Sequence, residues 1–127
     1  MTRFSVNGFD HIVLCVRDES ATCAFYQRVL GMEPREETPG KWSLHFGEHK
    51  ISLQEPETAP VIAKDTAPGS GNFCVISDTP VAEWREHLQR EGVEVVASGP
   101  KSGAVGMIDS LYFNDPDGNL VEVSNRL

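Results

Sequence analysis

Hydrophobic and polar residues follow one order twice along this chain, and the first copy begins near residue 11. The run 11–16 is apolar and rich in β-branched residues, which indicates a strand. The polar cluster 17–20 supplies helix-capping side chains, and a helix is predicted over 21–30 with Gly31 as its C-terminal stop. One face of this helix is expected to carry Ala21, Phe25 and Val29.

The second copy repeats this order. Residues 73–76 form the predicted strand, Thr79 and Pro80 mark a helix start, and Gly92 ends the helix. The apolar face of this helix is expected to carry Val81, Trp84 and Leu88. Such self-similarity predicts two related structural units.

Alternating apolar positions predict three further strands after each helix. They lie at 33–37, 41–46, 50–54, 94–97, 110–113 and 120–124. The Asn-Asp-Pro-Asp-Gly-Asn segment 114–119 is typical of a hairpin turn. Each half is therefore a βαβββ module, with module one at about 7–55, a linker at about 56–70 and module two at about 71–127. The linker is long enough for the modules to pair within one chain or to exchange between two chains.

Composition narrows the class of protein. A chain of 127 residues with 39% hydrophobic content suits one globular domain. The net charge of −8 and the absence of a Lys/Arg stripe argue against a nucleic-acid partner. No apolar run reaches the roughly 20 residues that span a bilayer, and residues 1–7 lack the order of a signal peptide, so we expect a cytoplasmic protein with no membrane partner. Cys15, Cys23 and Cys74 are expected to be buried free thiols.

Strand parity predicts which candidate functional residues lie on the sheet face that points away from the helices. If Ile12 and its alternate neighbours face the helices, His11 lies on the opposite, concave face, and the same argument places Ser52, Gln54 and Glu122 there. An imidazole and a carboxylate suit a divalent metal such as iron, manganese, nickel or zinc. The alternative stays open, because a histidine at a strand start often serves only as a hydrogen-bonding group and two ligands do not close a metal site.

Two motifs resemble a known family. The first comprises residues 10–18 (DHIVLCVRD) with 25–26 (FY) and 29–32 (VLGM), and the second is 112–123 (YFNDPDGNLVEV). Together they resemble the glyoxalase/bleomycin-resistance/extradiol-dioxygenase superfamily, also called the vicinal oxygen chelate family, over nearly the whole chain. Segments 68–70 and 103–108 are similar to the branch of glyoxalase-domain-containing protein 5 and bacterial lactoylglutathione lyases.

The resemblance implies an α+β fold in which two βαβββ modules form a curved mixed sheet, with helices outside and a pocket inside. It also implies a metal that binds two neighbouring substrate oxygens and acts as a Lewis acid. Of four ligand positions, His11 matches the first and Glu122 the last, so both are predicted metal ligands and Glu122 the catalytic residue. Ser52, with Gln54 nearby, and Asn72 depart from the pattern at the other two.

These departures limit what carries over to this chain. Ser52 cannot shuttle a proton as a glyoxalase carboxylate does, and Asn72 breaks the ligand triad of an extradiol dioxygenase. His45 is the local candidate for a further metal donor, or else a hydrogen-bonding group of the pocket. Tyr112 shares the concave parity and either hydrogen-bonds a ligand or packs as an ordinary aromatic.

Three functions remain open on these grounds. The first is a lyase or isomerase resembling lactoylglutathione lyase, working on a small oxygenated substrate through a divalent metal. The second is a non-catalytic small-molecule binding or resistance protein of the bleomycin-resistance type, and the third is an extradiol-type dioxygenase. A homodimer is expected, in which His11 of one chain meets Glu122 of the other if the modules exchange. The glycine-rich stretch 101–106 is expected to be a lid or a flexible connection.

Overall fold

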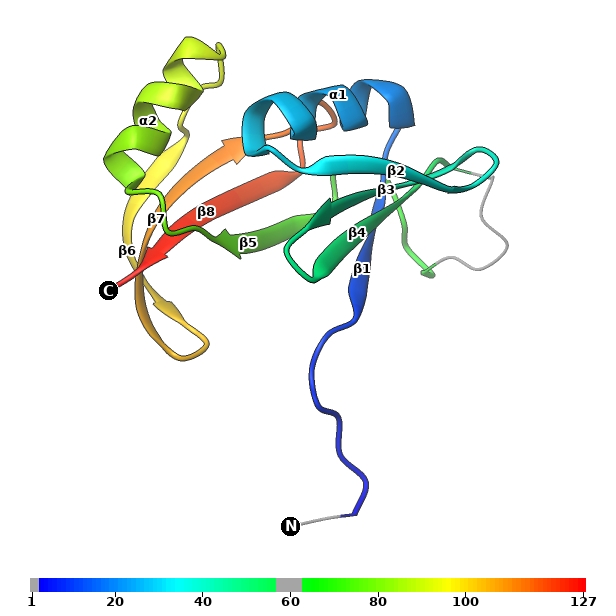
Figure 1. The fold of residues 1–127 in the computed structure, drawn as a ribbon, viewed down its shortest axis with the longest axis horizontal. Helices are drawn as coiled ribbons and strands as arrows, with labels where there is room; N and C mark the ends of the chain where they lie inside the picture. Colours follow the sequence, from blue (N-terminus) through cyan, green and yellow to red (C-terminus); the bar gives the residue numbers. More distant parts are fainter. Residues whose placement is uncertain (1–2, 57–62) are drawn as a thin grey trace.

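The computed structural model describes residues 3–56 and 63–127, so part of the predicted linker and the first two residues lie outside the described chain. Within those ranges the first half contains β1 (His11–Cys15), α1 (Glu19–Leu30), β2 (Glu33–Thr38), β3 (Lys41–Phe46) and β4 (His49–Gln54). The second half contains β5 (Asn72–Ile76), α2 (Val81–Arg90), β6 (Ala97–Gly103), β7 (Gly106–Asn114) and β8 (Leu120–Arg126). Both halves thus have the predicted βαβββ order (Figure 1).

Each half of the described chain forms its own four-stranded mixed sheet. The strand orders are β1-β4-β3-β2 and β5-β8-β7-β6, so the first strand of each half pairs in parallel with the last. The helices cover the outer side of the sheets, and the segment before β1 projects from the opposite side (Figure 1). The α+β class and the helices outside mixed sheets are confirmed. Neither helix in the described ranges has the length and apolar content that crossing a lipid bilayer requires.

The caps of α1 follow the sequence, but its buried face differs from the predicted one. The side chain of Asp18 accepts a hydrogen bond from the Ala21 amide, and Gly31 closes the helix with a φ of 69°. The residues buried on α1 are Thr22, Cys23, Tyr26 and Val29. Tyr26 is fully buried although its hydroxyl is polar, because that hydroxyl has a partner in the second half of the chain.

The prediction of a strand at 94–97 was wrong, and the stretch 101–106, expected to be a lid or a flexible connection, connects β6 to β7 but lies mostly within these two strands. Strand β6 starts at Ala97, and the glycine-rich stretch completes the β6–β7 hairpin. The sequence did not predict this strand because it contains Gly99 and Pro100, and both residue types are depleted in strands. A proline is tolerated here because β6 lies at the edge of its sheet, where one side of the backbone needs no partner.

One hydrophobic core joins the two halves. It contains Leu14, Tyr26 and Ile51 from the first half together with Phe113 and Val121 from the second. The helices also meet: His87 on α2 bonds to the carbonyl oxygen of Val29 on α1 at 2.8 Å. His87 therefore lies on the side of α2 that meets α1, and its ring forms an edge-to-face pair with Trp84 at 5.6 Å.

The Asn-Asp-Pro-Asp-Gly-Asn turn ties the halves together. Asp115 accepts hydrogen bonds from the Tyr26 hydroxyl at 2.7 Å and from the amides of Asp117 and Asn119. Burial raises the pKa of Tyr26, and the nearby carboxylate of Asp115 raises it further, so the hydroxyl stays a donor. Asn119 in turn accepts a bond from the Gly71 amide at 2.7 Å. This motif therefore acts as a structural clip.

Candidate functional site

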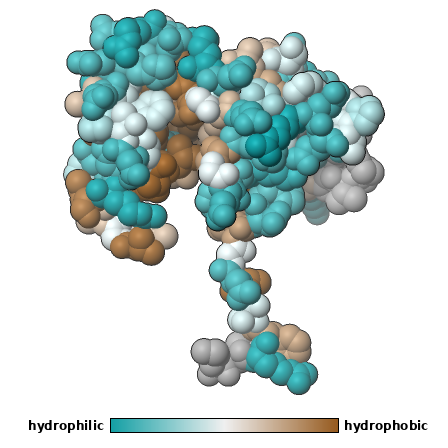
Figure 2. All heavy atoms as spheres, viewed as in Figure 1, coloured by the Kyte–Doolittle hydropathy of each residue, from teal (hydrophilic) through white to brown (hydrophobic). Residues whose placement is uncertain are grey.

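Each sheet has a concave face with its own pocket, and a cleft separates the two halves. The pocket on the first sheet, about 320 Å³, is lined by His11, Ser52 and Gln54 among others. The pocket on the second sheet, about 570 Å³, is lined by Tyr112 and Glu122. The cleft, about 760 Å³, touches His11 again and also Asn72. Apolar surface gathers in the hollow between the halves, while polar residues cover the helices (Figure 2).

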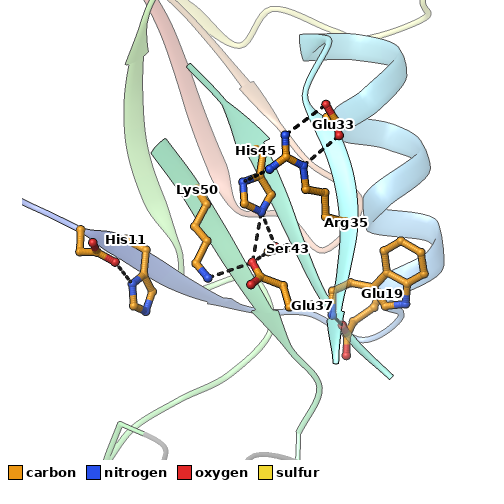
Figure 3. A network of polar contacts seen from close by, with 10 residues as sticks. His11, Glu19, Glu33, Arg35, Glu37, Ser43, His45 and Lys50 are labelled. Atoms are coloured by element: carbon orange, nitrogen blue, oxygen red, sulfur yellow. Dashed lines mark hydrogen bonds and ion pairs between the residues drawn. The ribbon is translucent and has the colours of Figure 1, made fainter. Parts of the chain in front are cut away.

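His11 stands at the first position of β1, with its side chain directed away from the helices. Its Nδ1 lies 2.8 Å from Oδ2 of the neighbouring Asp10 (Figure 3). Because a carboxylate can only accept, Nδ1 is the donor in this pair, and the neutral ring then carries its lone pair on Nε2. A carboxylate behind one ring nitrogen is the arrangement that orients histidine ligands toward metals.

His45 belongs to a polar network centred on Glu37, a residue of β2. Oε1 of Glu37 accepts hydrogen bonds from Ser43 at 2.6 Å, Lys50 at 2.9 Å and the Nε2 of His45 at 3.1 Å (Figure 3). These three hydrogen bonds lower the pKa of Glu37 to about 2, with the charge of Lys50 adding to the effect. On the other side of the ring, Arg35 approaches Nδ1 of His45 at 3.5 Å.

This network has a consequence for His45 as a possible metal donor. Nε2 donates its hydrogen to Glu37, and the lone pair on Nδ1, the one such lone pair of the neutral ring, faces the guanidinium of Arg35. His45 therefore makes hydrogen bonds through both ring nitrogens beside the pocket, and its role as a metal donor stays a prediction.

Glu122 is held by a chain of hydroxyl groups on the second sheet. Ser110 donates to its Oε2 at 2.6 Å, and the hydroxyls of Ser110 and Ser124 lie 2.6 Å apart. Both serines are fully buried. Tyr112 faces the same carboxylate, and the pKa of its phenol is raised by desolvation and then by a hydrogen bond to Glu122. The buried serines fix the carboxylate at the floor of the pocket.

The three cysteines are free thiols, and one of them differs from the prediction. Cys15 and Cys23 are buried, as expected, but Cys74 is exposed. The reason is strand parity: Cys74 pairs with Glu122 across β5 and β8 and shares its pocket, with Sγ 3.2 Å from the hydroxyl of Ser124. Desolvation raises the pKa of the Cys74 thiol, so it is largely protonated at neutral pH.

The donors suit a metal in type but do not meet within one chain. His11 has a carboxylate behind it, and Glu122 has a serine that orients it, as metal ligands require. They line separate pockets, however, and among residues 3–56 and 63–127 no three His, Cys, Asp or Glu side chains gather closely enough to bind a metal ion. Each concave face therefore offers one of the two predicted ligands.

Sequence reasoning missed the residues that organise both faces. Glu37, Lys41 and Lys50 line the first pocket, and Ser110 supports Glu122 in the second. Strand parity did not single out Lys50 as a pocket residue, because a lysine at a strand end is ordinarily solvated. Glu37 was hidden because residues 33–38 have almost no apolar alternation, and only pairing with β3 places this carboxylate beside Ser43.

Comparison with known proteins gives a consistent result. The family model described as the Glyoxalase/Bleomycin resistance protein/Dioxygenase superfamily matches residues 8–123. The sequence is 40% identical to Virulence protein STM3117 of Salmonella typhimurium, over 94% of this chain and 84% of that protein. The crystal structure of the same protein superposes with a TM-score of 0.94, covering 98% of this chain and all of the other at 35% identity.

Two further solved structures share this fold. Lactoylglutathione lyase from Agrobacterium tumefaciens is 27% identical, with a TM-score of 0.74 and 94% of each chain covered. The fosfomycin resistance protein FosX from Listeria monocytogenes, solved with Mn(II) and sulfate, has a TM-score of 0.69 at 22% identity, covering 97% of this chain and 93% of that one. The second likeness concerns the fold alone.

Proposed function

The chain belongs to the Glyoxalase/Bleomycin resistance protein/Dioxygenase superfamily, and from this premise we propose that it is a glyoxalase-like lyase or isomerase that acts on a small oxygenated substrate through a divalent metal. The observation that carries the proposal is that neighbouring side chains orient two candidate metal ligands. The Nε2 lone pair of His11 is left available by Asp10, and one oxygen of Glu122 is fixed by Ser110.

The complete site forms between two copies of the chain. In a symmetric dimer, the first sheet of one copy faces the second sheet of its partner, so that His11 of one chain joins Glu122 of the other. Support comes from the open concave faces, which expose Val13 of β1 at 51% and Ile76 of β5 at 44% although both are apolar. Covering these side chains would favour association.

The residues of this chain would divide the work as follows. His11 and Glu122 would hold a divalent metal, which when bound would supply Lewis acidity toward the substrate oxygens. Glu122 would also take the proton from the substrate carbon, with Ser110 keeping that carboxylate in place. Ser52, Gln54 and Asn72 contribute neutral hydrogen-bonding groups that orient the substrate oxygens.

A non-catalytic binding protein is the second candidate, and a specific observation favours it. Ser52 and Asn72 bear neutral side chains where further metal ligands would be needed, which leaves only two donors per site. For the same reason we expect turnover of the methylglyoxal–glutathione adduct to be weak or absent, because Ser52 cannot carry a proton between substrate carbons. An extradiol-type dioxygenase lacks comparable support.

Metal content after purification without chelator separates these functions. We expect one metal per site in the unmodified protein and loss of at least about tenfold in affinity in either His11→Ala or Glu122→Ala. Glu83→Ala, an exposed carboxylate on α2, is the matched control and should keep its metal. Absence of metal from the folded, unmodified protein would refute the enzyme proposal and favour the binder.

Mixing the two variants tests the shared site. If each site takes His11 from one copy and Glu122 from the other, random exchange of His11→Ala with Glu122→Ala subunits restores about one quarter of the metal sites, because half the dimers are mixed and each has one intact site. If both ligands come from one chain, mixing restores none, and the two-copy arrangement is wrong.

A further inference from the structure

The concave face of the first sheet carries more cations than its own carboxylates neutralise. Arg35 pairs with Glu33 at 2.9 Å, and Lys50 pairs with Glu37 at 2.9 Å. Lys41, on the same face by the register of β3, has no carboxylate within ion-pair distance among the described residues. Desolvation raises the pKa of Glu19 and the charge of Lys41 partly offsets this rise, but the two side chains lie beyond ion-pair distance. One positive charge therefore remains for a ligand.

The surroundings of Lys41 also suit an anion. Lys41 lines the pocket of about 320 Å³ together with Ser43, Ser52 and Gln54. Ser43 lies opposite Ser52, and the same antiparallel pairing brings the Lys41 end of β3 to the Gln54 end of β4. Ser52 and Gln54 offer hydroxyl and amide donors in the same pocket, whereas the Ser43 hydroxyl already donates to Glu37. Glu37, the carboxylate in this lining, already accepts three hydrogen bonds.

We infer that this pocket recognises an anionic oxygen group of the ligand, a carboxylate, phosphate or phosphonate, with Lys41 as its counter-ion. The inference deepens the proposed function, because His11 lines the same pocket and the anionic group would place the rest of the ligand against the imidazole. A chain with a net charge of −8 repels anions in general, so a local cation is what allows one to bind here.

The test is a titration of the metal-free, chelator-treated protein with inorganic phosphate and, separately, with malonate, followed by amide NMR shifts at low ionic strength. We expect the shifts to cluster at Lys41, Ser43, Ser52 and Gln54, and the affinity for each probe to fall about fivefold in Lys41→Met. Lys41→Arg keeps the charge and should keep most of the binding.

The control is Lys64→Met, which makes the same change of net charge at an exposed lysine far along the sequence from the pocket and should leave the affinity unchanged. Equal affinity in Lys41→Met and in the unmodified protein, or shifts confined to other regions, would overturn the inference. Because metal is absent throughout, this outcome is independent of whether His11 and Glu122 bind metal. A stronger response to phosphate than to malonate would identify the phosphoryl class.

Discussion

The two halves share one order of elements, yet the carboxylates on their concave faces have different kinds of partner. On the first sheet, partly exposed charges balance one another around Glu37, whose side chain is 38% exposed and whose partners include Lys50 and His45. On the second sheet, Glu122 depends on uncharged hydroxyls that are buried beneath it. A repeated backbone therefore does not dictate a repeated site, and we expect the first face to tolerate the loss of one partner better than the second.

The largest difference between the halves in the free energy lost on mutation is expected at the turns that precede their last strands. Asp115 lies in the turn of the second half, and its replacement by alanine leaves the buried Tyr26 hydroxyl and Asn119 without their acceptor. We expect a loss of about 3 kcal/mol or more in the free energy of unfolding, measured by urea denaturation. In the first half, Glu48→Ala in the exposed β3–β4 turn should cost less than about 0.5 kcal/mol. Equal losses would contradict the role of the turn as a clip.

The two serines that support the carboxylates provide the next comparison. Ser110→Ala removes the short bond to Glu122, and we expect a loss of about 1–2 kcal/mol in the free energy of unfolding. Ser43→Ala removes an equally short bond to Glu37, but Lys50 and His45 remain as donors, so the loss should be smaller. The contrast between the faces would be lost if Ser43→Ala proved the more damaging change.

The smallest expected effect is on the free energy of unfolding at acidic pH. The pKa of Glu37 falls from 4.5 to about 2 on folding, so its ionised form stabilises the folded state above pH 4.5, and this contribution is lost as the pH falls toward 2. Glu37→Gln should therefore lower the unfolding free energy modestly at pH 7, where the ionised side chain contributes, and flatten its decline between pH 4.5 and 2. Thermal unfolding at a series of pH values measures this. An unchanged acid profile would show that the network does not hold Glu37 in its ionised state.

Much of this architecture could be predicted from the sequence, because strands and helices that pack on one side carry periodic apolar positions. The βαβββ order and the caps of α1 follow from local patterns. Strand β6 was missed because Gly99 and Pro100 hide it, and only its long-range pairing with β7 reveals it.

The site could be predicted only in part. Parity placed His11, Ser52 and Glu122 on concave faces, since that depends on the residue's own strand. The Glu37 network depends on pairing between strands, and the support of Glu122 by Ser110 depends on register between β7 and β8. The proposed meeting of His11 and Glu122 needs a second copy of the chain, and strand parity alone does not predict how two copies assemble.

The prolines at the margins of the sheets also bear on solubility. Pro34 in β2 and Pro100 in β6 lie on the outermost strands, where each lacks the amide hydrogen that an incoming strand would need. Uncontrolled lateral growth into fibrils is thereby discouraged at these two margins. The opposite margins, formed by β1 and β5, carry no proline, so an added strand would meet less hindrance there.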